Sequence, residues 1–333
     1  MHAFRCWLAV AALALLPSMQ ARSQEDPAEA LTAWHAHTAE ALAVSPAAHE
    51  RVLALRLEAL AAQEEAPAPD AARTAVLLAD AQDDARALAW LLSGPALDPA
   101  QREAGLARLL VLAPDDLNAH LIAVAVAVAA EDAAAVTAAL TTAAARERLA
   151  GDSAGLLDFY VRLLERHPLP AVVLEAMAAA EGGGAGAEAY AFMLWSHDVP
   201  PYRALLRACE PAAVASDAAR DAACQTLGRR LFEQGDLILT QTVGYAVLHK
   251  LVDAAEAERL AVAMRRLEWQ QARVGELMAE PGRQAARLRA WLAAMRQPGS
   301  SEQAAAQALL AEAGVPLEPP ADWRSVREQA MAE

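Results

Sequence analysis

The sequence predicts an all-α protein made of many short helices. Its 333 residues are 56% hydrophobic but only 5% aromatic, and Ala alone makes up roughly a quarter of them. This composition excludes intrinsic disorder, which requires low hydrophobicity, and disfavours an all-β fold, because Ala is depleted in strands and favoured in helices. The 15 Gly and 18 Pro provide breaks between helices, and no alternating run rich in β-branched residues indicates a strand.

The first 23 residues have the layout of a secretory signal peptide. A short basic start (residues 1–5) precedes an apolar run (6–16), Pro17 ends that run, and residues 21–23 resemble a small-residue cleavage site. The apolar run is well short of the roughly 20 residues that span a bilayer, so a retained anchor helix is the weaker alternative. We therefore expect cleavage before Gln24 and a periplasmic or secreted protein.

Helical periodicity continues from residue 24 to the end of the chain. Apolar residues recur at spacings of three and four, and the segments between breaks are about 12 to 20 residues long, which is typical of globular helices. The breaks lie at 45–46, 67–70, 94–95, 113–116, 167–168, 182–184, 200–201, 235–236, 281–282 and 298–299. Helices of this length joined by short turns form antiparallel hairpins. We assign N-terminal hairpins to 24–116, a repeat region to 117–255 and C-terminal helices to 256–333.

The stretch 117–130 is the most apolar part of the chain after the signal peptide. It contains Asn118 and His120 and ends at Glu131, so it is too short to span a bilayer and is predicted to be a buried helix. We therefore expect no integral membrane segment after cleavage. So many helices exceed what one core usually organises, because cores stop growing at about 250–300 residues, and this favours an open stack of hairpins.

The best internal motif lies in residues 224–236. It places Leu227-Gly228, Leu231 and Gly235-Asp236 at spacings that resemble the first helix and turn of a tetratricopeptide repeat. Gly228 would let the partner helix approach closely, and Gly235 would supply a left-handed residue between the two helices. The second helix departs from the repeat pattern at Thr240, where Ala is usual.

A second window, 117–150, has the repeat length of about 34 residues, with a split at 131–132 and a small residue at Ala143. The breaks near Pro168 and Pro200 fit two further hairpins between the windows. The resemblance covers 117–255 and implies a right-handed superhelix of antiparallel hairpins, a tetratricopeptide-like α-solenoid. On such a superhelix, the concave surface that binds a partner would include Gln225, Arg229 and Phe232, and Arg229 would meet a peptide carboxylate.

Two cysteines, Cys209 and Cys224, remain after removal of the signal peptide. An even pair in an oxidising compartment favours a disulfide between neighbouring helices. Two separately buried thiols are the alternative.

Most of the sparse aromatic residues gather between 190 and 202. Trp195 and Tyr202 are candidate partner-binding residues, since Trp and Tyr are favoured binding anchors. Core packing is the preferred interpretation, because an Ala-rich chain needs large residues to fill its gaps.

No catalytic, cofactor-binding or metal-binding pattern is present in the sequence. His35 and His37 would point to different sides of a helix, and His49-Glu50 lacks the second His of a zincin motif. The acidic pair 115–116 is explained as an N-cap, and the pair 83–84 as a helix break or a solvated face. We therefore predict no catalytic residue, no cofactor and no metal.

Charge and architecture together suggest the function. The chain has 28 Lys+Arg against 43 Asp+Glu, a formal net charge of -15, so nucleic acid is not an expected partner. We expect an exported scaffold of the cell envelope that binds a protein or an extended peptide, with its oligomeric state open. The alternative is a scaffold or enzyme of peptidoglycan metabolism, because soluble lytic transglycosylases resemble this chain in having an Ala-rich α-superhelix. A small-molecule carrier with a pocket around Trp195 is a third possibility.

Overall fold

The protein is all-α throughout the part that its computed structural model describes, which comprises residues 26–62, 70–94, 97–147, 149–181, 186–280, 282–297 and 299–330. Within these ranges the only extended pairing is one isolated parallel bridge between Asp116 and Ala150. The all-α prediction is confirmed. The predicted signal peptide (1–23) and the break at 182–184 lie outside the described residues.

The first half of the chain contains α1 (Pro27–Ala43), α2 (Ala48–Ala61), α3 (Ala71–Asp80), α4 (Ala85–Leu92), α5 (Pro99–Leu112), α6 (Leu117–Ala129), α7 (Ala133–Ala144), α8 (Ser153–Arg166) and α9 (Ala171–Glu181). The second half contains α10 (Gly186–Ser196), α11 (Tyr202–Ala208), α12 (Pro211–Val214), α13 (Ala218–Gln234), α14 (Ile238–Leu248), α15 (Ala254–Met278), α16 (Gln284–Met295), α17 (Glu302–Glu312) and α18 (Val326–Ala330).

Aspartates begin many of these helices. Each of the Asp side chains named next accepts a hydrogen bond from a backbone N–H of the first turn, which satisfies donors that a helix leaves unpaired and places negative charge at the positive end of the helix dipole. They are Asp26, Asp70, Asp84, Asp98, Asp116, Asp132, Asp217 and Asp253. The cap predicted at 115–116 is therefore confirmed at Asp116. Asp84, expected at a helix break or on a solvated face, also caps a helix, so part of the acidic excess has a structural use.

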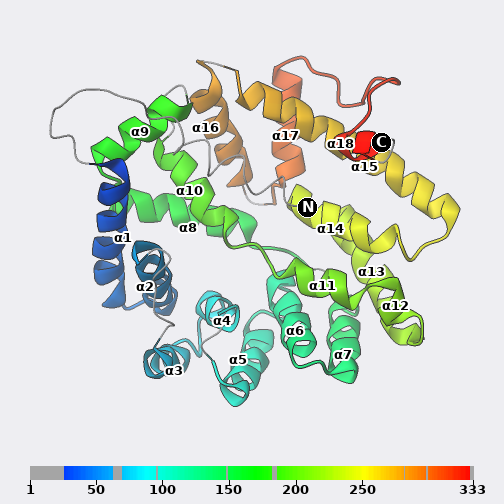
Figure 1. Ribbon diagram of the computed structural model, residues 1–333, viewed down its shortest axis with the longest axis horizontal. Coiled ribbons are helices and arrows are strands. Elements are labelled where there is room, and N and C mark those ends of the chain that lie inside the picture. Colours follow the sequence, from blue (N-terminus) through cyan, green and yellow to red (C-terminus); the bar gives the residue numbers. More distant parts are fainter. Residues whose placement is uncertain are drawn as a thin grey trace.

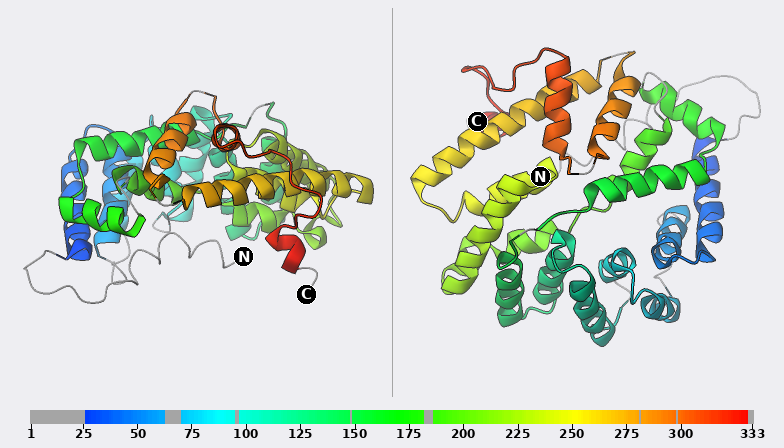
Figure 2. Two further views of the ribbon diagram at one scale, coloured as in Figure 1. Left: turned by 90° about the horizontal axis from the view of Figure 1, so that it is seen from above. Right: turned by 180° about the vertical axis from the view of Figure 1, so that it is seen from behind.

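The helices follow a closed path instead of a simple stack in sequence order (Figure 1). From α1 to α7 each helix packs on near neighbours in the sequence, and α7 then packs directly on α13. Among the described residues, the intervening α8–α10 do not pack closely on α7 or α13. Instead, α9 packs on α1, and α10 packs on α8 and α16. Figure 2 shows from above that the arrangement is shallower than it is wide. Of the helices between the two repeat windows, α8–α10 therefore pack elsewhere, whereas α11 packs on α6 and on α14.

Three main clusters of buried side chains lie along this path. One joins α1 and α2 to α8–α10 and α16, a second joins α6 and α7 to α11, α13 and α14, and a third lies under α2–α6. Helix α6 belongs to two of them, since Leu121 faces the second cluster and Ile122 the third. This double burial explains why α6 is apolar almost all round and confirms it as a buried helix.

Helices α13 and α14 form the closest hairpin of the repeat region. A Cβ on Gly228 would meet the Leu248 side chain at 3.0 Å, and one on Gly244 would lie 2.4 Å from the backbone nitrogen of Phe232. Gly228 thus permits the close approach that the motif predicts. The expectation of a left-handed Gly235 is wrong, because its φ is -60° and its ψ is 128°. Glycine suits this position for a different reason: a Cβ would lie 2.5 Å from the Leu231 carbonyl oxygen.

A disulfide joins Cys209, at the end of α11, to Cys224 in α13, with 5.7 Å between their Cα atoms. Both residues are buried in the second cluster. The predicted bridge is therefore present. No helix among the described residues has the length and apolar character that a membrane span requires.

Candidate binding groove along α15

The three α13 residues predicted to bind a partner, Gln225, Arg229 and Phe232, contact neighbouring helices. The Arg229 guanidinium forms a two-pronged ion pair with Glu256 of α15, with N–O distances of 2.9 and 3.0 Å. The Gln225 amide donates to Asp221, at 3.0 Å, and to the backbone of the α14–α15 turn. Phe232 packs on the ring of Tyr245. These three side chains connect α13 to α14 and α15 in the unliganded protein.

Trp195 and Tyr202 lie in the interior. The Trp195 indole N–H donates to the Ser153 carbonyl oxygen at 3.0 Å, and the Tyr202 hydroxyl bonds to that of Thr240 at 2.5 Å. Burial raises the pKa of the Tyr202 phenol above its usual range. Thr240 is fully buried, so the departure from the repeat's usual Ala supplies a hydrogen-bond partner for Tyr202. The structure does not bring these residues together with Gln225, Arg229 and Phe232 into one surface.

Polar groups that the sequence marked for chemistry serve structural roles. His35 is buried and hydrogen-bonds to the Tyr190 hydroxyl, and desolvation lowers its pKa to about 4. Burial alone would raise the pKa of Asp84, but hydrogen bonds from His49 and from backbone N–H groups outweigh it and lower the pKa to about 2. Among the described residues, no group of three or more His, Cys, Asp or Glu side chains is placed to hold a metal ion.

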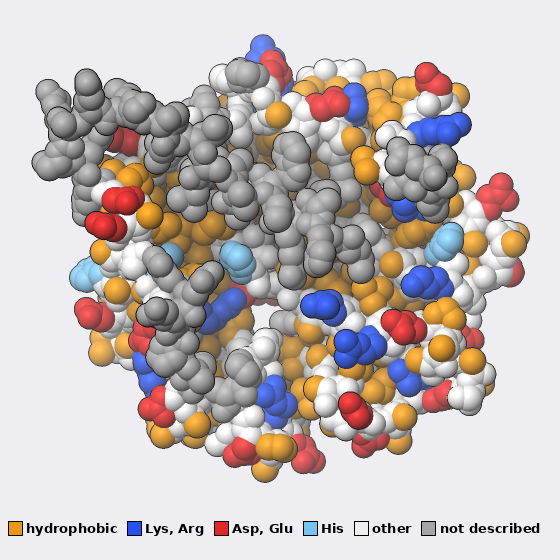
Figure 3. Space-filling model, viewed as in Figure 1, with side chains coloured by type: hydrophobic (Ala, Val, Ile, Leu, Met, Phe, Trp, Pro, Cys, Tyr) orange, Lys and Arg blue, Asp and Glu red, His pale blue; other side chains and the backbone are white. Residues whose placement is uncertain are grey.

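On the face seen in Figure 3, acidic, basic and apolar side chains are intermixed, and no large patch there carries charge of a single sign. Two hollows in the described part of the molecule are candidates for a ligand site. One, of about 580 Å³, has mixed polar and apolar walls and lies where the turn before α8 meets the α13–α14 and α16–α17 turns, next to Asp236 and the Asp158–Arg296 ion pair. The other lies along α15 and is mainly apolar.

Helix α15 is the longest helix described, and the C-terminal strap (residues 313–325) lies against it. The Trp269 indole N–H donates to the Pro316 carbonyl oxygen at 2.8 Å, and the Gln270 amide donates to the Leu317 carbonyl oxygen at 3.1 Å. Arg265 donates to three further carbonyls of the strap, those of Pro320, Ala321 and Trp323. One face of α15 therefore presents a row of donors to the strap backbone, which bends at 317–318 and turns at 320–323.

Side-chain contacts reinforce this row. The Trp269 and Trp323 rings meet edge to face with centroids 5.4 Å apart, and the Arg265 guanidinium lies over Trp323. Arg266 forms a two-pronged ion pair with Glu318 of the strap. Both partners of that pair are exposed, so it contributes little more than about 1 kcal/mol and mainly sets the register of the strap.

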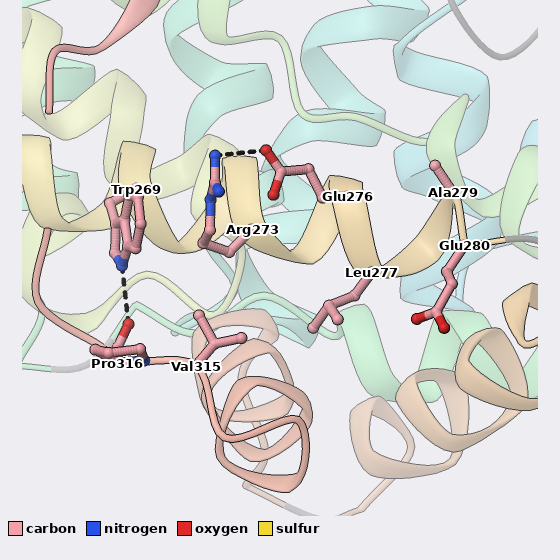
Figure 4. A pocket seen from close by; sticks show the side chains of 8 residues that line it. All are labelled: Trp269, Arg273, Glu276, Leu277, Ala279, Glu280, Val315 and Pro316. Carbon is pink, nitrogen blue, oxygen red and sulfur yellow. Dashed lines mark hydrogen bonds and ion pairs between the residues drawn. The ribbon is translucent and has the colours of Figure 1, made fainter.

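The cavity of about 450 Å³ continues the groove beyond the point where the strap begins (Figure 4). Its apolar lining comprises Trp269, Leu277, Ala279, Val315 and Pro316. At its edge the Arg273 guanidinium stacks on Trp269, 4.5 Å from the ring centroid, and pairs with Glu276 at 2.5 Å. The buried Nε of Arg273 has no hydrogen-bond partner within the described part of the chain.

We call the strap track and this cavity together the α15 groove. It combines a Trp face, an apolar recess, an Arg edge and a row of backbone-directed donors, which is the chemistry of a site for an extended peptide. Sequence reasoning missed it, because Trp269 and Arg273 look like ordinary members of a long helix. The available signal was their spacing of four residues together with the prolines of the strap, Pro316, Pro319 and Pro320.

Comparison with known proteins gives no further guide to the site. No model of a protein family matches the sequence, and neither curated proteins nor solved structures include one that is significantly similar to it.

Proposed function

We propose that the protein is an exported helical scaffold, periplasmic or secreted, that binds a partner protein through an extended peptide segment in the α15 groove. The observation that carries this proposal is the apolar cavity beside Trp269, bordered by Arg273 and open at the surface. Its volume falls within the range of about 300–1,000 Å³ typical of ligand sites, and it combines apolar walls with a few polar groups.

The fold suits this role. We infer that the hairpins α6–α7 and α13–α14 are degenerate tetratricopeptide-like units within a right-handed superhelix, which is supported by the close approach at Gly228 and Gly244. Superhelical repeat proteins present extended surfaces to peptides. The disulfide between Cys209 and Cys224 supports an oxidising compartment.

The binding role is tested with peptides selected from a random phage-displayed library on the purified mature protein. Selected peptides are then titrated by fluorescence anisotropy against the wild type and against Ala279→Trp, which fills the cavity from its exposed rim. The matched control is Ala255→Trp, an exposed position at the far end of the same helix.

We expect Ala279→Trp to weaken binding by at least about tenfold, a loss of about 1.4 kcal/mol, and Ala255→Trp to leave it unchanged. Failure of the library to yield any binding peptide would overturn the proposed function. Equal binding to the wild type and to Ala279→Trp would show that the partner binds elsewhere.

A further inference from the structure

The C-terminal strap is held mainly through its backbone. Its carbonyl groups at 316, 317, 320, 321 and 323 all accept hydrogen bonds from side chains of α15. Hydrogen bonds to backbone carbonyls are available to any segment with the same backbone conformation. The donors Trp269, Gln270 and Arg265 therefore form a surface that recognises backbone shape more than the identity of the strap.

The strap has the composition of a proline-rich ligand. It carries Pro316, Pro319 and Pro320, whose rings fix the backbone φ at these positions. The strap bends at 317–318, and the Trp323 N–H donates to the Pro320 carbonyl oxygen at 3.1 Å and closes a turn. Aromatic-lined grooves bind these segments because little conformational entropy remains to be lost. The Trp269 indole and its donor N–H at Pro316 supply the two elements of that mode.

The strap is weakly anchored by apolar contacts. Between residues 313 and 325 only Ser325 is buried, and Leu317 stays exposed. Hydrophobic burial is the main source of stability for a docked segment, at roughly 25 cal/mol per Å² of apolar area. A segment that buries so little is released at small cost, so the surface beneath it can be exchanged.

The cavity explains what an exchanging ligand would gain. The strap begins after α17, where Gly314 has a φ of +70° and the chain turns so that Pro316 reaches Trp269 of α15. Val315 and Pro316 line one side of the recess, and Leu277 and Ala279 line another. A separate segment on the same track could place a larger apolar side chain between them.

We propose that the α15 groove recognises a proline-containing segment of a partner protein that adopts the bent backbone of the strap, and that the chain's own strap occupies part of the groove as an intramolecular competitor. This inference rests on the proposed function and specifies its ligand. The preferred segment carries prolines opposite Trp269, a carboxylate opposite Arg266, and an apolar side chain at its N-terminal end for the cavity. Binding displaces the strap.

The competition is tested on the full mature chain with a fluorescein-labelled synthetic peptide of residues 313–326. The releasing variant combines Glu318→Arg, which sets a like charge against Arg266, with Trp323→Ala, which removes the contact with Trp269. Because the tethered strap competes at millimolar effective concentration, we expect the peptide to bind the releasing variant at least about tenfold more tightly than the wild type. The exposed Glu103→Arg on α5 is the control for charge and should behave as the wild type.

A second substitution tests the recognition surface without removing the ring. Trp269→Phe in the releasing background keeps an aromatic face but deletes the N–H that donates to Pro316, and we expect peptide affinity to fall by about two- to tenfold. Hydrogen exchange of residues 313–325 in the wild type should accelerate when a phage-selected peptide saturates the groove.

The outcomes separate this inference from the proposed function. If phage-selected peptides bind and depend on Ala279 but lack proline and leave exchange of the strap unchanged, competition by the strap is refuted and the peptide-binding function stands. Equal affinity of the strap peptide for the wild type and the releasing variant also refutes the competition. If the library yields no binding peptide, the proposed function itself fails.

Discussion

Substitution of Gly244 by Ala tests the close packing of α13 on α14. An added Cβ would lie 2.4 Å from the Phe232 nitrogen, 2.7 Å from the Gly228 oxygen and 2.9 Å from the Leu231 carbonyl carbon. All three atoms belong to the backbone of α13, so the clash cannot be relieved by turning a side chain. The two helices would have to move apart along the hairpin.

The magnitude follows from two opposing effects. Replacing Gly by Ala inside a helix stabilises it by about 1 kcal/mol, whereas overpacking a well-packed contact costs about 1–3 kcal/mol. Because the contacts of Gly244 are all with backbone, the upper end applies, and we expect a net loss of about 2 kcal/mol of unfolding free energy. Gly228→Ala meets only the side chains of Leu248 and Val247, which can shift, so its loss should be smaller.

Gly275 provides the matched control. It lies in α15, is exposed, and would have no atom within 4 Å of an added Cβ, so Ala there should stabilise the helix by up to about 1 kcal/mol. The assay is urea unfolding followed by far-UV circular dichroism, with midpoints and slopes compared across the three variants. If Gly244→Ala were as stable as the wild type while Gly275→Ala showed its expected gain, the close approach of α13 and α14 would be refuted.

Two further predictions concern the bridge and the buried histidine. Replacing both Cys209 and Cys224 by Ser should lower the unfolding free energy by about 3 kcal/mol on the chain-entropy model. Reductant should shift the urea midpoint of the wild type alone, and Ellman titration of the denatured, unreduced mature protein should find no thiol. For His35, burial lowers the folded-state pKa from 6.5 to about 4, so the unfolded chain takes up the proton more readily. The contribution of His35 to the unfolding free energy is therefore intact above pH 6.5 and falls by about 3 kcal/mol as the pH drops to 4. His35→Gln should flatten this dependence of the unfolding free energy on pH. An unchanged pH dependence in His35→Gln would contradict the role given to the buried His35.

Local structure could be predicted from the sequence because it depends on neighbouring residues. Asp116 was recognisable as a cap from its position after Pro114 and before a helical run, and it accepts backbone hydrogen bonds there. The pairing of Cys209 with Cys224 followed from compartment and number. The apolar run from 117 predicted a buried helix, because only burial on several sides suits such a composition.

The spatial order of the helices could not be predicted in the same way. Helical periodicity shows which face is buried but not which helix covers it, so nothing local indicated that α7 would pack on α13 while α9 returned to α1. Arg229 likewise carries no local mark of its ion pair with Glu256, which lies beyond α14 in the chain. The α15 groove could not be predicted for the same reason. Half of it comes from the strap, whose sequence indicates only a proline-rich break between helices.

The return of α9 to α1 and of α10 to α16 has a consequence for how the chain folds. In a linear repeat protein each unit is completed by its neighbour, so folding can spread along the chain as it emerges. Here the apolar face of α1, with Trp34 and Leu42, is covered by a cluster that includes residues from α8–α10 and α16. Contacts between such distant segments slow folding, because the chain must close a long loop first. We therefore expect the N-terminal helices to keep an apolar face exposed until nearly the whole chain has been synthesised.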